Sequence, residues 1–323
     1  MFRVLLAAPL DADAEARLAA AATIVRPAAT GPVALRAALA DCDALVVRTN
    51  IPVTRELLTA GAGRLRVVGV AGVGLDQVDT QAAAELGVAV VYTPAAASDA
   101  VAELAVGLMI QLLRPIPRLA AEYRSGRYAE ARALPHGREL RELTVGVLGM
   151  GRIGSRVGRI CSAGIGARVL YHDIAPVGPF SFAAEPVTFE RLLAESDVLT
   201  LHVPLTERTR GLVDAAVLGR LRPGALLINT ARGAVVDTPA LVSALRSGRL
   251  AGAALDVTEP EPLPPEHPLF SFDNCIVLPH VAARTHGGLR RMYAVVDEVL
   301  SHLRLAGQDG GPAGRRGQSD SEP

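Results

Sequence analysis

The feature of this chain that most constrains its fold is a glycine-rich turn that follows a short apolar run. Residues 149–154 read GMGRIG, and residues 145–148 before them have the pattern of a buried strand. A helical pattern follows the turn, and a second mostly apolar run, residues 167–172, ends at Asp173, 19 residues beyond Gly154. A GxGxxG motif between a strand and a helix, with an acidic residue about 20 positions further on, is typical of a dinucleotide-binding unit.

Each residue of this motif has a physical role. Gly149 permits the tight turn, Gly151 lets the backbone approach a pyrophosphate, and Gly154 lets the helix pack against the strand. The helix N-terminus presents unpaired N–H groups and a positive dipole end to the phosphates. Asp173 can accept hydrogen bonds from both ribose hydroxyls, and no Arg or Lys follows at 174–176 to bind a 2′-phosphate. The motif therefore predicts NAD rather than NADP as the cofactor.

Length and composition narrow the class of protein. A chain of 323 residues, half of them apolar, suits two domains with large cores. Lys+Arg and Asp+Glu balance at 33 each, so no net basic field is present to attract nucleic acid or an anionic membrane. No apolar run reaches the roughly 18 residues of a transmembrane helix, and residues 1–9 read as a first strand rather than a secretion signal.

The cysteines point to a reducing compartment. Cys42, Cys161 and Cys275 lie far apart and form no CxxC pair. This spacing argues against a disulfide framework or a structural zinc site, and we expect no metal. The sequence predicts that the three thiols are small core residues in a cytoplasmic protein.

Strand and helix patterns alternate along the chain, which predicts parallel, doubly wound sheets. The elements predicted in the first hundred residues are strands 4–8, 44–47, 66–70 and 88–91 and helices 13–22, 33–40, 54–60 and 82–86. A long apolar helix is predicted from about 100 to 113. The later predicted strands are 198–203, 225–229, 253–256 and 275–278. A last helix over 288–303 should pack on the first domain, and the Gly-rich, polar residues 306–323 are predicted to be disordered.

The polar, irregular segment 116–143 is too long for a simple connector. Two interpretations remain open for it. It is either an arm that wraps a partner subunit or a solvated surface helix with its loop.

Polar side chains follow three of the later predicted strands, 225–229, 253–256 and 275–278. Arg232 follows the first of them, Asp256 with Glu259 and Glu261 follows the second, and His280 follows the third. The carboxyl ends of parallel strands face the cofactor crevice in such a fold. An arginine, an acid and a histidine from three strand ends can therefore meet, although 48 positions separate Arg232 from His280.

Taken together, these residues and motifs resemble those of the D-2-hydroxyacid dehydrogenase family, whose members include phosphoglycerate, glycerate, hydroxypyruvate and glyoxylate enzymes. The matching stretches span roughly residues 40–300 in the family's order: 72–76, 101–103, 149–154 with Asp173, 201–205, 229–233, 254–257 with 261–262, and 279–282. The resemblance implies an α/β fold of two doubly wound parallel-sheet (Rossmann/flavodoxin-like) domains. The NAD-binding domain, residues 99–283, would be inserted in a substrate domain made of residues 1–98 and 284–305.

The resemblance also implies a reaction, the transfer of a hydride between the nicotinamide and C2 of a small 2-hydroxy or 2-keto acid. Arg232 would hold the substrate carboxylate and polarise the 2-keto oxygen. His280 would be the general acid in reduction and the base in oxidation. Glu261 would hydrogen-bond His280, fix its tautomer and favour the imidazolium. Glu259 competes for that role, and the family's spacing from the arginine favours Glu261.

Further contacts are implied in the same way. Backbone N–H groups at Val73 and Gly74 would bind the other face of the substrate carboxylate, and Asp256 would hold the nicotinamide carboxamide. The other implied cofactor contacts are Arg152 and Ile153 at the pyrophosphate, Ser98 at a phosphate or the nicotinamide, and the backbones of Val203, Thr230 and Ala231 around the nucleoside. The family also implies a homodimer formed through the 116–143 arm.

Departures from the family pattern limit the substrate. Val70 stands where many phosphoglycerate enzymes have Arg, and Val73 stands where phosphite-oxidising relatives have Lys. Formate enzymes have Gln at the position of Glu261, and Ala282 replaces a frequent Gly. Phosphoglycerate, phosphite and formate are therefore not expected. Two alternatives stay open: an NADH-sensing, corepressor-like binding protein of the same fold, and a dehydrogenase for an amino acid or a hydroxy acid of opposite hand.

Overall fold

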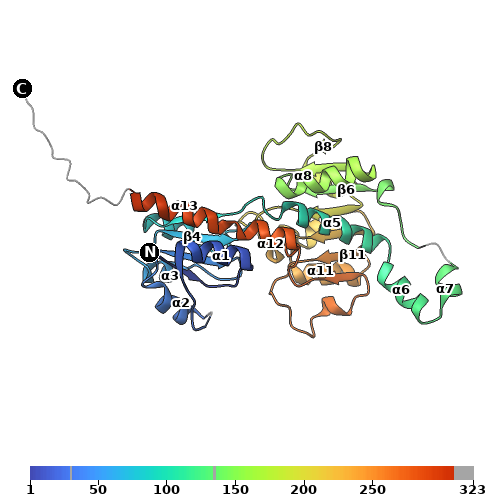
Figure 1. The fold of residues 1–323 in the computed structure, drawn as a ribbon. Coiled ribbons are helices and arrows are strands. Elements are labelled where there is room, and N and C mark those ends of the chain that lie inside the picture. Colours follow the sequence, from blue (N-terminus) through green and yellow to red (C-terminus); the bar gives the residue numbers. More distant parts are fainter. Residues whose placement is uncertain (30, 134–135, 309–323) are drawn as a thin grey trace, which may run out of the picture. The chain divides into compact units, whose positions relative to one another are not determined.

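The computed structural model describes residues 1–29, 31–133 and 136–308. The chain divides into two compact units: residues 1–96 together with those from 286 onward, and Ala97–Thr285 (Figure 1). The second unit is thus an insertion in the first. Its boundaries lie two residues from those proposed from the sequence.

The first unit contains a five-stranded parallel sheet in the order β2-β1-β3-β4-β5, the flavodoxin-like order. Its strands are β1 (Phe2–Leu6), β2 (Ala22–Val25), β3 (Ala44–Arg48), β4 (Val67–Ala71) and β5 (Ala89–Tyr92). Its helices are α1 (Ala12–Ala21), α2 (Pro32–Leu39), α3 (Arg55–Ala60), α4 (Thr80–Glu85), α12 (His286–Tyr293) and α13 (Val295–Gln308).

Helix α13 closes the core of the first unit. A Cβ atom added at Gly69, in the middle of β4, would lie 2.4 Å from Cγ2 of Val299, so the helix packs directly on the strand backbone. Val295, Val299 and Leu303 on this helix are completely buried. The last helix therefore packs on the first unit, as the sequence predicts.

The second unit contains a seven-stranded parallel sheet in the order β12-β11-β10-β9-β6-β7-β8. Its strands are β6 (Thr144–Leu148), β7 (Arg168–His172), β8 (Glu185–Pro186), β9 (Val198–Leu201), β10 (Ala225–Asn229), β11 (Leu250–Leu255) and β12 (Cys275–Val277). Its main helices are α5 (Ser98–Leu113), α8 (Arg152–Arg159), α9 (Phe189–Glu195), α10 (Ala215–Arg220) and α11 (Thr238–Arg246). This is the order of a Rossmann sheet, and the predicted fold class is confirmed.

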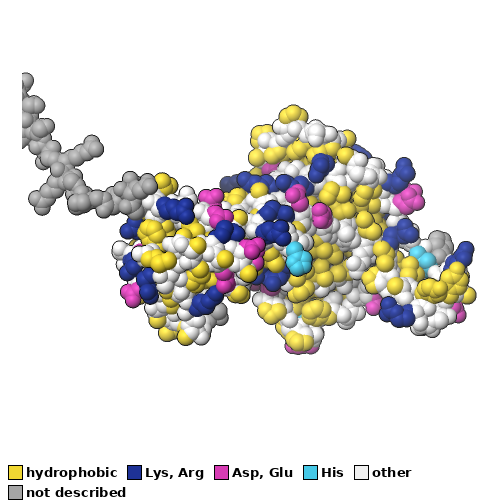
Figure 2. All heavy atoms as spheres, viewed as in Figure 1, with side chains coloured by type: hydrophobic (Ala, Val, Ile, Leu, Met, Phe, Trp, Pro, Cys, Tyr) yellow, Lys and Arg dark blue, Asp and Glu magenta, His cyan; other side chains and the backbone are white. Residues whose placement is uncertain are grey.

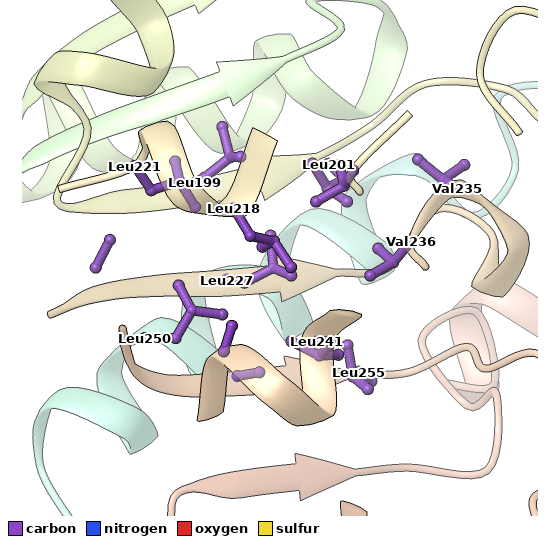
Figure 3. Packing of buried hydrophobic residues seen from close by; sticks show 14 of the residues in the cluster. Leu199, Leu201, Leu218, Leu221, Leu227, Val235, Val236, Leu241, Leu250 and Leu255 are labelled. Carbon is purple, nitrogen blue, oxygen red and sulfur yellow. The ribbon is translucent and has the colours of Figure 1, made fainter. Parts of the chain in front are cut away.

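Branched aliphatic side chains fill the space between this sheet and its helices (Figure 3). Leu227 lies near the middle of β10 and is completely buried. It belongs to one cluster with Leu218 of α10 and Leu241 of α11. Continuous apolar strands of this kind are expected where helices cover both faces of a parallel sheet.

Several predicted boundaries are wrong. The predicted helix 13–22 ends at Ala21 and strand β2 follows at once, which the sequence did not indicate. The single helix predicted over 288–303 is two helices, α12 and α13. Helix α13 runs to Gln308, three residues into the predicted disordered tail. The rest of that predicted tail lies outside the described residues.

The segment between α5 and β6 contains helices α6 (Ile116–Arg124) and α7 (Tyr128–Arg132), neither of which has a buried residue. Ile116 and Tyr123 are 55% and 63% exposed, and the rings of Tyr123 and Tyr128 lie 5.2 Å apart. Figure 1 shows these helices projecting from the end of α5, and Figure 2 shows hydrophobic side chains on them.

No single helix in the described part of the chain is long and apolar enough to cross a membrane. Helices α5 and α6 pass that test only together, with a bend of 55° between them. Helix α5 buries its apolar residues in the core of the second unit, as a core helix does.

Candidate functional site

The residues proposed from the sequence lie at one edge of the second sheet. All its paired strands are parallel, so their carboxyl ends share that edge. Six adjacent strands, β12, β11, β10, β9, β6 and β7, are followed there by His280, Asp256, Arg232, His202, Gly149 and Asp173, respectively. The strand order reverses between β9 and β6, and ligands of doubly wound sheets bind at this switch point.

The three glycines of the turn have three different surroundings. Gly149 has φ +89°, a conformation that L side chains rarely adopt. A Cβ atom at Gly154 would lie 2.0 Å from the carbonyl oxygen of Gly149, so helix α8 packs tightly against the turn. A Cβ atom at Gly151, the N-cap of α8, would meet nothing within 4 Å. Open space at this N-terminus fits a pyrophosphate, which the free N–H groups of the helix can bind.

Asp173 lies beside this turn. Its Oδ2 accepts a hydrogen bond from Met150 N at 2.7 Å, and its Oδ1 accepts one from Ala175 N at 3.0 Å. The next residue, Ile174, is 91% exposed. The carboxylate is therefore held next to the open end of α8, where a ribose attached to a bound pyrophosphate would lie.

Three buried side-chain atoms have no hydrogen-bond partner among the described residues: Ser98 Oγ, Thr230 Oγ1 and His202 Nδ1. Buried polar atoms are nearly always paired, so unpaired ones in a fold of this kind fit contacts with a bound ligand or water. Ser98 is the first residue of α5, and Thr230 directly follows β10. Both were proposed from the sequence as cofactor contacts, and their free hydroxyls fit that role.

His202 directly follows β9, in the stretch 201–205 that matches the family, and two hydrogen bonds hold it there. Its Nε2 lies 2.9 Å from Thr200 Oγ1, and its backbone N–H donates to the carbonyl of Leu148 at 2.8 Å. Burial lowers the pKa of His202 to about 3, so the imidazole is neutral near pH 7. The sequence signal for this position was its place at the end of a strand, in the stretch Leu-His-Val-Pro.

His280 and Glu261 form a pair. Nδ1 of His280 lies 2.8 Å from Oε1 of Glu261, and the two side chains are 42% and 44% exposed. This bond engages one ring nitrogen and directs the other, Nε2, away from the carboxylate. The geometry joins His280 to Glu261 and not to Glu259, whose carbonyl accepts a hydrogen bond from Thr238 at 3.0 Å.

The backbone of His280 is unusual. Among the described residues it is the one that is not glycine and has a positive φ, +54°. Such conformations cost free energy and persist where the surroundings hold them, often at active sites. Three hydrogen bonds to Asp256 surround this residue: His280 N donates to the Asp256 carbonyl at 2.9 Å, and the carboxylate accepts from Val281 N and Ala282 N at 2.8 Å each.

Asp256 itself is 1% exposed. Burial raises the pKa of its carboxyl group, and the two backbone N–H donors partly oppose that shift. Both carboxylate oxygens of Asp256 already accept hydrogen bonds from backbone N–H groups. The contact with a nicotinamide carboxamide stays a prediction.

Arg232 follows β10 and is partly buried. Its Nη1 donates to the carbonyl of Ala231 at 2.7 Å. The side chain of Asn229, 1% exposed, brackets this turn: its Oδ1 accepts from Ala231 N at 3.0 Å and its Nδ2 donates to the Arg232 carbonyl at 2.9 Å. Sequence reasoning gave Asn229 no role.

Of the other proposed residues, Arg152, Ile153, Val203 and Ala231 belong to the second unit, on α8 or just after β9 and β10. Val73 and Gly74 belong to the first unit, in the loop after β4. No group of three or more His, Cys, Asp or Glu side chains in the described part of the chain is placed to hold a metal ion.

Comparisons with known proteins show the family of this chain. The family described as "D-isomer specific 2-hydroxyacid dehydrogenase, NAD binding domain" matches residues 106–282. A glyoxylate reductase of Aeropyrum pernix is 41% identical over 267 residues, which are 80% of this chain and 79% of that protein. D-Lactate dehydrogenase from Aquifex aeolicus, solved with NAD and lactic acid, matches with a TM-score of 0.82 and 27% identity over 95% of this chain and 96% of that one.

A third relative was solved with the other nicotinamide cofactor. It is an NADPH-dependent glyoxylate/hydroxypyruvate reductase from Sinorhizobium meliloti in complex with NADP and malonate, with a TM-score of 0.83 and 35% identity over 93% of each chain. The match to the family covers more than half of this chain and includes the glycine-rich turn and the strand-end arginine, glutamate and histidine. The chain therefore belongs to the D-isomer-specific 2-hydroxyacid dehydrogenase family, and its second unit is the NAD-binding domain of such an enzyme.

Proposed function

We propose that this enzyme transfers a hydride between NAD and C2 of a small, unphosphorylated 2-hydroxy or 2-keto acid. The observation that carries the proposal is the placement of Arg232 and of the Glu261–His280 pair after three adjacent strands, at the sheet edge that also holds the glycine-rich turn. Relatives named glyoxylate reductase and hydroxypyruvate reductase act on acids of this class.

Three side chains divide the chemistry. The planar guanidinium of Arg232 binds the substrate carboxylate and polarises the 2-keto oxygen. A nicotinamide cofactor held at this sheet edge would supply the hydride to C2 during reduction and accept it during oxidation. The imidazolium of His280 donates the Nε2 proton to the 2-keto oxygen during reduction, and the neutral ring takes it back during oxidation. Glu261 holds the proton on Nδ1 and so keeps Nε2 as the exchanging nitrogen.

The cofactor contacts follow from the same sheet edge. Gly151, Arg152 and Ile153 at the start of α8 would hold the pyrophosphate, and Asp173 would hold the ribose. The buried hydroxyls of Ser98 and Thr230 would gain partners, and Val203 and Ala231 would line the nucleoside. A 2′-phosphate would meet the Asp173 carboxylate with no described basic residue at 174–176, so we propose NAD over NADP.

We propose that the backbone N–H groups of Val73 and Gly74, in the loop after β4, bind the substrate carboxylate. Val70 at the end of that strand is 1% exposed and apolar, so it offers no charge to a phosphorylated acid. The preferred substrates are then glyoxylate, hydroxypyruvate or a small branched 2-keto acid.

The test mixes the purified protein with NADH and a panel of these 2-keto acids, and follows the absorbance of the reduced cofactor. His280→Ala should lower turnover about 10²- to 10⁴-fold, the range for the loss of one acid–base group. His302→Ala, on α13 of the first unit, is the matched control and should keep the wild-type rate.

Three outcomes contradict parts of the proposal. Unchanged turnover in His280→Ala would refute the assignment of the acid–base group. Binding of NADH with no turnover on any acid, together with capture of a protein partner, would favour the corepressor-like alternative. A product of L configuration would show a dehydrogenase of opposite hand.

Two further features belong to this proposal. We propose that α6 and α7, with their exposed Ile116, Tyr123 and Tyr128, form the contact of a homodimer. We also propose a cytoplasmic location, because the three cysteines are free thiols, as is usual in a reducing compartment. Cys42 and Cys161 are buried, Cys275 is partly buried, and burial raises the pKa values of Cys161 and Cys275 to about 12.

A further inference from the structure

We propose that Asn229 and Asp256 are a pair of positioning residues that fix the backbones of Arg232 and His280 to one pair of neighbouring strand ends. The proposal rests on the function proposed above. In this proposal the two buried side chains set the relative position of the reacting groups. Asp256 thereby has a role separate from its predicted contact with the nicotinamide carboxamide.

Asn229 acts on the arginine side. It is the last residue of β10 and is 1% exposed. The oxygen and the nitrogen of its side-chain amide both bond the turn that carries Arg232. Oδ1 accepts a hydrogen bond from Ala231 N at 3.0 Å, and Nδ2 donates one to the Arg232 carbonyl at 2.9 Å. A side chain that combines one acceptor with one donor in this shape is an amide, so an aspartate there would place an oxygen against the carbonyl oxygen.

Asp256 acts on the histidine side. It directly follows β11, and its carboxylate accepts from Val281 N and Ala282 N at 2.8 Å each. Two N–H donors require an acceptor at both positions, which a carboxylate provides and an asparagine amide does not. Together with the bond from His280 N to the Asp256 carbonyl at 2.9 Å, these contacts hold His280 at its positive φ.

The hydrogen bonds of the Asn229 side chain form one clamp and those of the Asp256 side chain form a second, and a backbone hydrogen bond joins the two clamps. Asp256 N donates to the Asn229 carbonyl at 2.9 Å, which continues the pairing of Asn229 with Leu255 across β10 and β11. A continuous set of hydrogen bonds therefore runs from the Arg232 carbonyl through Asn229 and Asp256 to residues 280–282. Because Arg232 and His280 are far apart in the chain, their relative position depends on this set, and displacement of a reacting group by about 1 Å can cost about 10²-fold in rate.

The experiment compares Asp256→Asn and Asn229→Asp with two controls that make the same exchanges at the opposite edge of the same sheet. Asp197, before β9, accepts a hydrogen bond from Thr144 N at 2.9 Å, and Asn274, before β12, donates to the Ala251 carbonyl at 2.9 Å. The control variants are Asp197→Asn and Asn274→Asp. Steady-state kcat and KM, the Kd for NADH without keto acid, and the melting temperature are measured for all four.

The two clamps should have different kinetic signatures. Asp256→Asn should lower kcat about 10- to 100-fold and leave the KM for the keto acid near its wild-type value, because proton donation by His280 occurs in the transition state. Asn229→Asp should raise the KM for the keto acid by a larger factor than it lowers kcat, because Arg232 binds the carboxylate from the ground state onward. The control variants should keep both constants within about twofold of wild type.

Wild-type kcat and KM in both test variants, or losses matched by the controls, would overturn the proposal. A rise in the Kd for NADH as large as the loss of kcat in Asp256→Asn would also overturn it, because Asp256 would then act through the cofactor. Amide hydrogen exchange on the wild-type protein gives a readout that needs no variant. The N–H groups of Val281 and Ala282 should be protected, and exchange at the unstructured rate would contradict the clamp. Absence of turnover on every keto acid of the panel in the wild-type protein, in contrast, would refute the proposed function itself.

Discussion

Two glycines of the same turn should respond differently to one added methyl group. The Cβ of Gly154→Ala would meet the Gly149 carbonyl oxygen at 2.0 Å, so we expect the fold to lose about 1–3 kcal/mol through overpacking. Gly151→Ala places its Cβ in open space and should keep the wild-type melting temperature. It should nevertheless weaken NADH binding about tenfold or more, equivalent to about 1.4 kcal/mol, because the methyl group occupies the approach of the pyrophosphate.

Thermal melting and titration of NADH fluorescence measure the two effects. Gly164→Ala, with no atom within 4 Å of the added Cβ, is the control and should change neither quantity. If Gly151→Ala binds NADH as tightly as wild type, the pyrophosphate does not lie at the start of α8.

His202 should make the fold sensitive to acid. Burial lowers the pKa of His202 to about 3 in the folded chain, whereas an unfolded histidine has a pKa of about 6.5. Between these values the unfolded chain binds a proton that the folded chain does not. Acidification below pH 6.5 therefore favours unfolding by at most about 1.4 kcal/mol per pH unit from this group.

Urea unfolding at pH 7 and pH 5 measures this dependence. His202→Gln should lose less stability between the two pH values than wild type does. His302→Gln should behave as wild type. Equal losses in all three proteins would show that His202 titrates normally in the folded chain.

Residue chemistry made part of the site predictable. An arginine, a glutamate and a histidine after strands, and an aspartate after a glycine-rich turn, carry their chemistry in their type and spacing. The clamping roles of Asn229 and Asp256 were not predictable in this way. Their partners are backbone groups, which every residue has, and the Asp256 contact with Val281 spans 25 positions.

At the level of elements, strands bounded by polar residues and turns were predicted closely, as β10 was. Strand β2 was missed because it follows α1 with no Gly or Pro between them, and the residue where helix passes into strand is Ala22. The break between α12 and α13 was missed for the same reason, since the intervening residue is Ala294. The sequence carries no local signal at either boundary, and tertiary packing sets both.

The central strand β10 should be sensitive to loss of volume. Leu227→Ala removes a completely buried side chain from the cluster between the sheet, α10 and α11, and should destabilise the fold by about 2–5 kcal/mol. Val33→Ala, at a side chain that is 73% exposed, should change stability by less than about 0.5 kcal/mol. Denaturant unfolding compares the two, and a similar small loss in both would show that the core closes over the missing leucine.

On the scale of the whole molecule, the length and the alternation of elements predicted two domains with parallel sheets, and the resemblance to the family implied the insertion of one unit in the other. The open question was the 116–143 segment. Its two helices have no buried residue within their own chain. A helix pair that exposes large hydrophobic side chains and has no core of its own is typical of a contact with another subunit.

We therefore expect light scattering to give twice the chain mass of 33.6 kDa for the wild-type protein. The double variant Tyr123→Ser/Tyr128→Ser should shift it toward a single chain, because it removes two exposed aromatic rings that would anchor the contact. Val33→Ser, at an apolar side chain of the first unit that is 73% exposed, should leave the mass unchanged. A wild-type protein that scatters as one chain would contradict the dimer.

The interrupted first unit has a consequence for synthesis. The ribosome makes strand β4 early, but it makes the helix that packs on Gly69 only after the whole of Ala97–Thr285. The inserted unit is thus complete in sequence while the surrounding unit still lacks α13. A premature stop before Val295 would therefore leave the sheet of the second unit intact. The sheet of the first unit would keep an uncovered apolar face, and chaperones and proteases recognise surfaces of this kind.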